Sequence, residues 1–377
     1  MRILQLTSDW KWTGPAAPMV ELLLALRQRG HEVWLACPPP PPGATSSLRG
    51  RACEAGAAPD LELTRGRGLR PLRDRTEARR LAAWLAEREV DVVHAWHTRD
   101  HLLALRAGAL RSRGGPALVR AWKSAARIPA SPWNRWLFGP GTDGLLCVSP
   151  GAARAQARLR GGRPLRGAFG AVDPQRFRPA PGRSARLAEE LGIAPEHVVV
   201  GIAARVQRHR RFDLLLEAMA RLARAVPDAR LVVIGRGTHL EEVARAPARR
   251  LGIADRVVFA GYRSDDYVDA LRLCDVFSLL VPGSDGGCRA VLEAAACGVP
   301  AVTTRRGALP EIVVDGETGI LVDERPEALA AAWQALLADP SRRARMGRAA
   351  RERATRCFTR EHLADAVEDL YSQALSR

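Results

Sequence analysis

The sequence predicts an α/β protein built from two doubly wound domains, each a parallel sheet with helices on both faces. Short apolar runs alternate with amphipathic stretches along the whole chain, which is the pattern of repeated strand–helix units. Turn residues and two prolines interrupt this pattern between residues 170 and 179. A length of 377 residues is too great for one compact core and suits two domains.

The first half of the chain alternates five candidate strands with helical patterns. The candidate strands are Ile3–Thr7, Glu32–Cys37, Asp91–Trp96, Ala117–Ala121 and Gly144–Val148. Apolar residues at helical spacing cover Ala17–Arg29 and Thr76–Glu89, and the prolines at 38–42 predict an extended loop. Because a strand-like stretch begins almost at the first residue, we expect no signal peptide.

The second half repeats the pattern. Its candidate strands are His197–Ala203, Arg230–Ile234, Val257–Ala260, Val276–Leu280, Val299–Thr303 and Gly319–Val322. Its candidate helices are Phe212–Ala225, His239–Leu251, Asp265–Leu273, Arg289–Cys297, Pro326–Leu337 and a last one at Thr359–Leu375. We therefore expect one domain over residues 1–173, a second over 174–357, and a final helix at 358–377 that packs back across the cleft between them.

The positive charge is distributed unevenly. The chain has a net charge of +17, and of its 58 basic residues only Lys11 and Lys123 are lysines. A GC-rich genome produces an arginine bias without selection for function, but it charges both halves alike. Here residues 1–175 carry a net charge of +13 and residues 176–377 only +4. A basic half of this kind suits nucleic acid, an anionic membrane or an acidic substrate.

Composition narrows the class of protein. The seven cysteines are scattered and never spaced as CxxC, which argues against a disulfide framework and a zinc site and favours a reducing cytoplasm. No apolar run approaches the roughly 20 residues that span a bilayer. A nucleic-acid binder would show a recognised motif or clustered aromatics, and aromatics make up 5% of the chain. We therefore expect no nucleic-acid partner.

The segment Ser284–Pro300 has the most specific pattern. It follows a candidate strand, passes through two glycines and opens a helix, where backbone N–H groups attract anions and phosphate above all. One carboxylate, Asp285, lies in the loop, and another, Glu293, lies two turns into the helix. An ordinary strand–glycine–helix connection, with an acidic residue that favours the helix dipole, would give part of this pattern.

With this segment the chain resembles the retaining glycosyltransferases of family four, whose GT-B architecture has two Rossmann-like domains facing a central cleft. The family's signature is an acidic residue, then Gly, then Glu eight positions after the first, then Ala-x-x-x-Gly-x-Pro. The matching residues are Asp285, Gly286, Glu293, Ala294, Gly298 and Pro300. The resemblance implies that Asp285 holds donor-sugar hydroxyls and Glu293 the ribose hydroxyls. The remaining donor contacts expected in this loop are Gly286, Gly287, Cys288 and Arg289.

A second segment, Gly201–Phe212, resembles the family's Gly-Arg-Leu followed by Lys-Gly. Arg205 stands at the family's arginine and Arg210 at its lysine. Two fixed cations are what a departing nucleotide diphosphate needs, because negative charge grows on it as the glycosidic bond breaks. The family's two glycines are Ala204 and Arg211 here. Surface arginines are frequent in this chain, and they are the alternative interpretation of the pair.

Two glycine-containing turns extend the resemblance. Val257–Tyr262 is similar to the family's strand and turn that contact the nucleobase, which implies donor contacts at Gly261 and Tyr262. Gly14 falls in the first loop, where the family has a glycine-rich loop under the diphosphate.

Two further positions point to the acceptor side. Asp91–His97 resembles the family's D-V-V-H-x-H, with His94 in the strand and His97 at its end, facing the cleft. Where the family commonly has Thr-x-His, this chain has Ala121-Trp122-Lys123. A lysine there is a flexible cation for anionic groups, a neutral replacement, or a sign of altered catalysis. The catalytic residues expected from the resemblance are Arg205, Arg210, Asp285, Lys123 and His97.

The resemblance implies front-face substitution, in which the leaving phosphate helps to take the acceptor's proton. We expect no metal, no cofactor and no protein nucleophile. The expected partners are a nucleotide-sugar donor, a glycan or lipid-linked glycan acceptor as in lipopolysaccharide synthesis, and an anionic membrane surface. Arginine clusters at 65–80 and 154–166 would meet that surface from the cytoplasmic side. Two alternatives stay open: a nucleotide-sugar epimerase or hydrolase of this architecture, and a sugar-nucleotide-binding homologue with altered catalysis.

Overall fold

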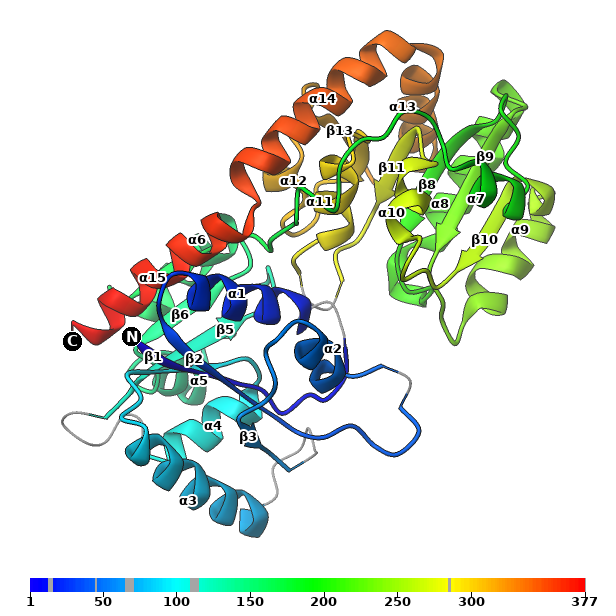
Figure 1. The fold of residues 1–377 in the computed structure, drawn as a ribbon. Helices are drawn as coiled ribbons and strands as arrows, with labels where there is room; N and C mark the ends of the chain where they lie inside the picture. Colours follow the sequence, from blue (N-terminus) through cyan, green and yellow to red (C-terminus); the bar gives the residue numbers. More distant parts are fainter. Residues whose placement is uncertain (13–15, 45, 65–70, 109–114, 284–285, 377) are drawn as a thin grey trace. The chain divides into compact units, whose positions relative to one another are not determined.

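The computed structural model describes residues 1–12, 16–44, 46–64, 71–108, 115–283 and 286–376, and the chain divides into two compact units (Figure 1). The N-terminal unit comprises Met1–Ala171 together with Arg360–Arg377, and the C-terminal unit comprises Val172–Thr359. Each unit has its own parallel sheet, so the α/β class expected from the sequence is correct. The last helix of the chain belongs to the N-terminal unit.

The sheet of the N-terminal unit has the strand order β3-β2-β1-β4-β5-β6-β7. Its strands are β1 (Arg2–Leu6), β2 (Glu32–Cys37), β3 (Leu61–Glu62), β4 (Val92–Ala95), β5 (Ala117–Trp122), β6 (Gly144–Cys147) and β7 (Leu165–Gly167). Its helices are α1 (Ala16–Gln28), α2 (Leu48–Glu54), α3 (Pro71–Glu87), α4 (Thr98–Arg106), α5 (Pro132–Phe138), α6 (Pro150–Arg160) and α15 (Arg360–Leu375). The order reverses between β1 and β4, which makes these two strands the switch point of the sheet.

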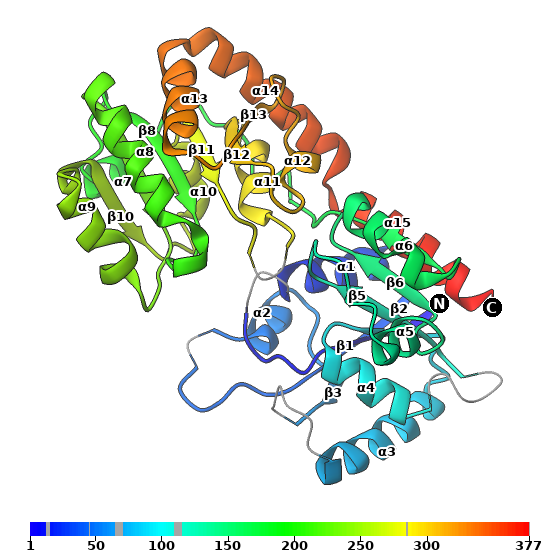
Figure 2. The same cartoon turned by 180° about the vertical axis from the view of Figure 1, so that it is seen from behind.

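Helix α15 completes one face of this sheet. It packs beside α1 and over β5, β6 and β7, whereas α3 and α4 lie on the other face (Figures 1 and 2). Leu363, Val367, Leu370 and Tyr371 are buried at helical spacing, which explains why this segment docks as an amphipathic helix. The terminal segment therefore contributes core to the first unit, although it follows the second unit in the sequence.

A buried polar chain fixes α15 to the sheet. Trp96 Nε1 donates to Gln5 Oε1 (2.6 Å), Gln5 Nε2 donates to the hydroxyl of Tyr371 (3.2 Å), and this hydroxyl lies 2.8 Å from His94 Nδ1. These directions allow the Tyr371 hydroxyl to donate its proton to Nδ1 of a neutral His94. Burial, and then the charges of Arg120 and Lys123, lower the pKa of His94 to about 3.

We predict that acidification destabilises the N-terminal unit through His94 and a second buried histidine, His101. Burial, followed by the charge of Arg120, also lowers the pKa of His101 to about 3. In the unfolded chain both titrate near pH 6.5, so below that pH the unfolded state binds more protons and stability is lost progressively down to about pH 3. At pH 5.5 the loss is on the order of 1 kcal/mol per histidine. Urea unfolding at pH 7.5 and 5.5, with His94→Gln as comparison, measures it; an unchanged pH dependence in His94→Gln would contradict the assignment.

The sheet of the C-terminal unit has the order β10-β9-β8-β11-β12-β13. Its strands are β8 (Val198–Ala203), β9 (Ala229–Ile234), β10 (Val257–Gly261), β11 (Val276–Leu279), β12 (Ala301–Thr304) and β13 (Gly319–Val322). Its helices are α7 (Ala185–Glu190), η1 (Arg208–Arg210), α8 (Phe212–Ala225), η2 (Glu241–Arg245), α9 (Ala246–Arg250), η3 (Ala254–Arg256), α10 (Tyr267–Arg272), α11 (Arg289–Ala296), α12 (Leu309–Ile312), α13 (Pro326–Ala338) and α14 (Pro340–Cys357).

Packing in the C-terminal unit follows from its apolar faces. Helices α8 and α13 pack against each other over one core, and the indole of Trp333 donates to Ser278 Oγ (2.8 Å) inside it.

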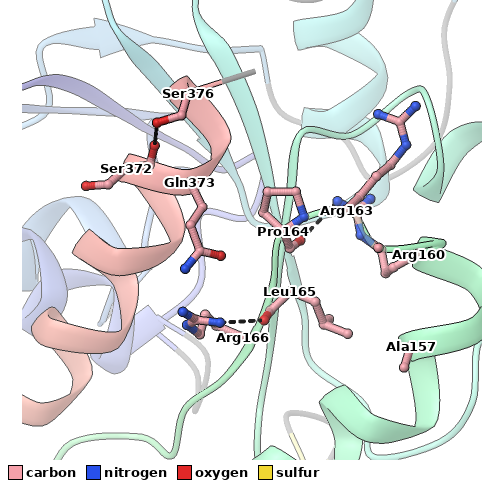
Figure 3. A pocket seen from close by; sticks show the side chains of 10 residues that line it. Ala157, Arg160, Arg163, Pro164, Leu165, Arg166, Ser372, Gln373 and Ser376 are labelled. Carbon is pink, nitrogen blue, oxygen red and sulfur yellow. Dashed lines mark hydrogen bonds between the residues drawn. The ribbon is translucent and has the colours of Figure 1, made fainter.

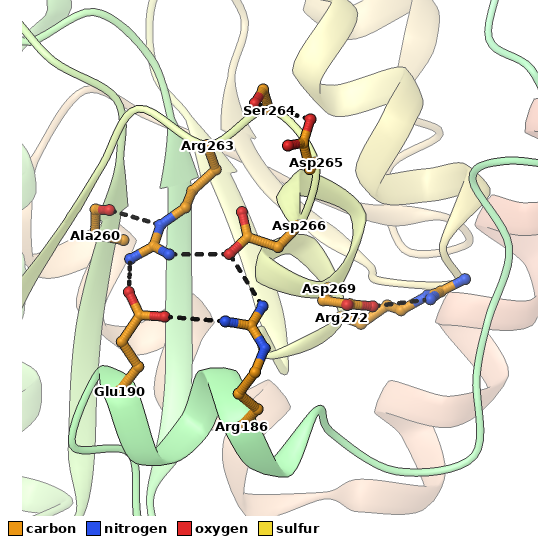
Figure 4. A network of polar contacts seen from close by, with 9 residues as sticks. All are labelled: Arg186, Glu190, Ala260, Arg263, Ser264, Asp265, Asp266, Asp269 and Arg272. Atoms are coloured by element: carbon orange, nitrogen blue, oxygen red, sulfur yellow. Dashed lines mark hydrogen bonds and ion pairs between the residues drawn. The ribbon is translucent and has the colours of Figure 1, made fainter.

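An ion-pair network surrounds the turn after β10 (Figure 4): Arg263 contacts the carbonyl of Ala260 and the carboxylates of Glu190 and Asp266. This network ties that turn to α7, and so fixes the carboxyl end of β10.

Two expected elements need correction. The single helix expected at His239–Leu251 is a π-helical turn followed by α9, and Pro247 at the start of α9 lacks the N–H that a continuous helix would use. The strand expected from Val299 begins at Ala301, because Pro300 has no N–H to donate to the ladder. The sequence predicts no bounds for helices α2, α4, α5, α6, α7, α12 and α14 or for the short strands β3 and β7.

Candidate active site

The switch point of the C-terminal unit lies between β8 and β11, where the strand order reverses. Arg205 follows β8 directly; it is exposed and forms no hydrogen bond or ion pair with the part of the chain that the structure describes. Arg210 ends the short helix η1, and its guanidinium donates to the carbonyl of Val281 in the loop after β11 (2.9 Å). The fold thus brings the loops of the two expected cations and the acidic signature to one edge.

Close backbone contacts support the loop of Arg205. A Cβ at Gly235, whose φ is +144°, would lie 2.1 Å from the carbonyl oxygen of Ala204. A Cβ at Gly237 would lie 2.0 Å from the carbonyl oxygen of Val206. The turn after β9 therefore needs glycine at both positions, because its backbone packs directly against the backbone of the turn after β8. Arg211, which stands where the family has glycine, has a φ of +58°, the left-handed conformation that glycine adopts most easily.

The loop before α11 is sharply turned. Cys288 precedes the helix with a φ of +48° and is buried, and its thiol contacts the carbonyl of Gly286, which has a φ of +60°. A non-glycine residue in this conformation is uncommon and is found preferentially at functional sites. Asp285 and Gly14 lie outside the described residues.

Glu293 is held by two neighbours inside the C-terminal unit. It is 4% exposed, and its carboxylate accepts from Arg289 Nε (2.6 Å) and from the hydroxyl of Tyr267 (2.8 Å). Burial and then the charge of Glu293 raise the pKa of Tyr267 well above its usual value. Sequence reasoning missed Tyr267, although it is one of only three tyrosines in the chain. Each carboxylate oxygen has a second lone pair for a ligand hydroxyl.

An exposed aromatic follows β10. Tyr262 is 56% exposed, and the guanidinium of Arg236 lies 5.0 Å from the centre of its ring. Gly261 has a φ of +71°, and its carbonyl accepts from Gly235 N (2.7 Å). The turns after β9 and β10 therefore present an aromatic face and a cation together, next to the loop that carries Arg205.

The switch point of the N-terminal unit holds a second group of polar residues. His97 Nδ1 contacts Asp100 Oδ2 (3.1 Å) and Thr7 Oγ1 (3.2 Å), and Lys123 Nζ lies 3.1 Å from His97 Nε2. Because the ammonium can only donate, Nε2 accepts and the ring proton is on Nδ1, toward Asp100. Lys123 Nζ also lies 5.4 Å from the centre of the Trp96 ring. The histidine therefore orients the lysine.

These residues border a narrow pocket at the carboxyl ends of β1, β4 and β5. Its lining residues are Thr7, Asp9, Lys11, Ala16, Met19, Leu48, Trp96, His97 and Lys123. The two lysines of the chain, among 58 basic residues, thus meet at one pocket. That coincidence favours a role for the ammonium groups over a neutral replacement of the family's histidine.

A larger pocket, of about 620 Å³, lies among α6, β7 and α15 (Figure 3). Leu165 begins β7, so this pocket belongs to the amino ends of the strands, away from His97 and Lys123. Arg160 borders it but is 1% exposed, and its guanidinium donates to the carbonyls of Thr142 (3.0 Å) and Asp143 (2.9 Å). The expectation that the whole cluster at 154–166 faces a membrane is therefore wrong for Arg160, which is structural.

The described residues contain no metal cluster, no membrane-spanning helix and no disulfide. No group of three His, Cys, Asp or Glu side chains there is arranged to hold a metal ion. No helix within those residues is long and apolar enough to cross a membrane. Each of the seven cysteines is a free thiol.

Comparison with known proteins gives the family. Residues 184–353 match "Glycosyl transferases group 1" and residues 14–176 match "Glycosyltransferase Family 4". A GDP-mannose-dependent alpha-(1-6)-phosphatidylinositol monomannoside mannosyltransferase of Mycobacterium tuberculosis is 30% identical over 312 residues, 77% of this chain and 78% of the relative. The protein of the same name from Mycolicibacterium smegmatis is 39% identical over 188 residues, 48% of this chain and 49% of the relative.

The chain spans about half the length of several curated relatives that it matches. Among solved structures, Anabaena Alr3699/HepE in complex with UDP and glucose has a TM-score of 0.79 and 18% identity, with 99% of both chains covered. This likeness shows the fold, the GT-B architecture with two Rossmann-like units. Together, the two matched segments and the Mycobacterium tuberculosis relative place the chain in a family: it belongs to the group 1 glycosyltransferases of glycosyltransferase family 4.

Proposed function

We propose that this protein is a retaining glycosyltransferase that moves a sugar from a nucleotide-sugar donor to a phosphorylated or lipid-linked acceptor in cell-envelope glycan synthesis. The observation that carries the proposal is the carboxyl edge of the C-terminal unit. There Arg205 is exposed and unpaired within the described chain, and the guanidinium of Arg210 bonds to the loop that leads to Glu293. This edge offers cations for a diphosphate and a held carboxylate for ribose hydroxyls.

The proposed chemistry needs little from the protein beyond positioning and charge. Negative charge grows on the diphosphate as the bond to the sugar breaks, and Arg205 and Arg210 offset it. The acceptor oxygen attacks from the same face, and the leaving phosphate takes its proton, so no protein nucleophile is required. We also propose that the reaction proceeds without a metal ion, so chelation by EDTA leaves the rate unchanged.

Support for the acceptor class comes from the N-terminal unit and from the relatives. The names of the mycobacterial relatives specify GDP-mannose and phosphatidylinositol monomannoside, and those of others specify inositol 3-phosphate. The two lysines beside this narrow pocket and the basic N-terminal half supply positive charge for an acceptor with a phosphate. A phosphoglycolipid acceptor therefore has more support than the lipopolysaccharide-like acceptor expected from the sequence. A peripheral position on an anionic membrane agrees with it.

A donor panel tests the function. UDP-, GDP-, ADP- and TDP-sugars are screened by ligand-induced thermal shift. At a concentration about one hundred times its Kd, one of these donors should raise the Tm of the protein by about 5 °C. We expect GDP-mannose to be that donor. Incubation with that donor and a phospholipid acceptor should then yield a glycoside. A protein that none of the four donor classes stabilises, or that only epimerises or hydrolyses the donor, would refute the proposal.

A further inference from the structure

One part of the N-terminal unit is almost free of acidic residues. Residues 101–172 contain twelve lysines and arginines and a single carboxylate, Asp143. That carboxylate accepts a hydrogen bond from the backbone N–H of Leu118 in β5 (2.8 Å), so it has a structural role in the sheet. The segment spans β5, α5, β6, α6 and β7. The segment therefore has a large excess of positive charge, and of its arginines Arg106 and Arg166 pair with carboxylates of other segments, Asp74 and Asp369.

The same segment exposes two tryptophans on one short helix. In α5, Trp133 is 55% and Trp136 43% exposed, and their ring centroids lie 5.3 Å apart at a tilt of 32°. The other side of the helix buries Leu137 and Phe138 in a core with α6, which fixes the indoles outward. Large aromatic side chains so exposed on one helix usually mark an interaction surface.

Three arginines flank the tryptophans. Arg127, Arg135 and Arg158 are exposed, and none forms an ion pair with the residues that the structure describes. Some surface arginines elsewhere pair with carboxylates: Arg221 with Glu327 (2.5 Å), for example, and Arg208 with Glu242 (2.6 Å). Unpaired cations beside exposed indoles match the interface of an anionic bilayer, where tryptophan lies at headgroup level and arginine meets phosphate.

The loop that carries Arg127 is joined to α6, the helix that carries Arg158. Arg127 Nε donates to the carbonyl of Ala155 in α6 (3.3 Å), and the N–H of Ile128 donates to Gln156 Oε1 (2.9 Å). The loop before α5 is thus fastened to α6 within three residues of Arg158. It follows the carboxyl end of β5, four residues after Lys123. Arg127 and this loop therefore lie at the same edge of the sheet as the lysine pocket, whereas Arg158 follows Ala157, which borders the pocket at the amino ends of the strands.

We propose that Trp133, Trp136, Arg127, Arg135 and Arg158, here called the tryptophan–arginine surface, bind the interface of an anionic lipid bilayer. The indoles enter the headgroup layer and the guanidinium groups contact lipid phosphates. This assignment rests on the proposed function, since a lipid-linked acceptor requires a membrane and Arg127 extends the surface to the sheet edge that holds Lys123. It selects α5 and α6, and not the arginines of α3, as the membrane-binding face.

Vesicle co-sedimentation of the full chain tests the surface. The probes are phosphatidylglycerol–phosphatidylcholine vesicles and pure phosphatidylcholine vesicles, at low and high salt. Wild type should bind the anionic vesicles at low salt. Trp133→Ser/Trp136→Ser should weaken binding at least tenfold, and Arg135→Ser/Arg158→Ser about 25-fold at low salt. The matched control, Arg79→Ser/Arg80→Ser on α3, removes the same charge elsewhere and should retain most binding.

Every other outcome refutes the proposal that the tryptophan–arginine surface binds the membrane. Binding retained in both surface variants, lost equally in the α3 control, or equal for the two vesicle types refutes it, as does no binding by wild type. A wild-type dimer that the tryptophan variant dissociates would assign the surface to a second copy of the chain. The two variants act independently, so misfolding of one leaves the other as a test. Donor-induced thermal shift in the same samples separates failure of the membrane surface from failure of the proposed function. If the vesicle test refutes the surface but the donor still raises Tm, the proposed function is unaffected.

Discussion

Arg205→Ala is expected to lower kcat/KM for sugar transfer by about 100-fold to 1,000-fold, or roughly 3 to 4 kcal/mol of transition-state stabilisation. The residue follows β8 at the switch point, and its guanidinium has no hydrogen bond or ion pair among the described residues. Its removal therefore costs the fold little. The cost falls on the diphosphate, whose charge increases as the glycosidic bond breaks.

Arg208→Ala is the matched control for this prediction. It removes an exposed arginine three residues further along, which pairs with Glu242 (2.6 Å). Its kcat/KM should stay within a few-fold of wild type, and both variants should melt like wild type. Steady-state kinetics with the donor selected by thermal shift gives the comparison. Full activity in Arg205→Ala would show that Arg205 does not stabilise the donor diphosphate.

Lys123→Ala is expected to lower kcat/KM with the phosphorylated acceptor by about 30-fold, the loss of one charge-assisted hydrogen bond of about 2 kcal/mol. The ammonium is oriented by His97 Nε2 (3.1 Å), and it borders a pocket that contains the other lysine, Lys11. The effect should fall on the KM for the acceptor and spare the KM for the donor, because the expected donor residues other than Gly14 belong to the C-terminal unit.

Lys123→Arg separates charge from geometry. Arginine keeps the positive charge, but its planar fork does not fit a position built for a compact ammonium, so only partial recovery is expected. His97→Gln should weaken acceptor binding less than Lys123→Ala, because it disturbs the orientation of the lysine and keeps its charge. Wild-type acceptor kinetics in Lys123→Ala would mean that the position is merely a tolerated difference from the family.

Periodicity predicted the fold because the strands are buried and short. β2, β13 and α8 have the bounds expected from their apolar spacing, and most other predicted strands differ by one or two residues. The helices that were missed have weaker patterns. α14 is rich in arginine, and α5 has only seven residues with two of its three large aromatics exposed, so neither shows a clean apolar stripe.

Site residues were predictable only where a motif fixed their spacing. Arg205, Arg210 and Glu293 follow strands and fall at an edge where the topology collects them. Tyr267 lies 26 residues before Glu293, and no local pattern relates the two residues; only tertiary packing does. Arg160 was taken for a surface cation, since its sequence neighbourhood does not reveal the backbone carbonyls that bury it. The roles of the motif residues remain predictions.

The most direct test of the account is the anomeric configuration of the first-formed product. The protein is incubated with the donor that stabilises it and a phospholipid acceptor, and proton NMR follows the anomeric signal of the transferred sugar. We predict that the new glycoside keeps the configuration that the sugar has in the donor, at a rate that Arg205→Ala lowers at least 100-fold. An inverted anomer, or release of free sugar with no glycoside, would contradict the account.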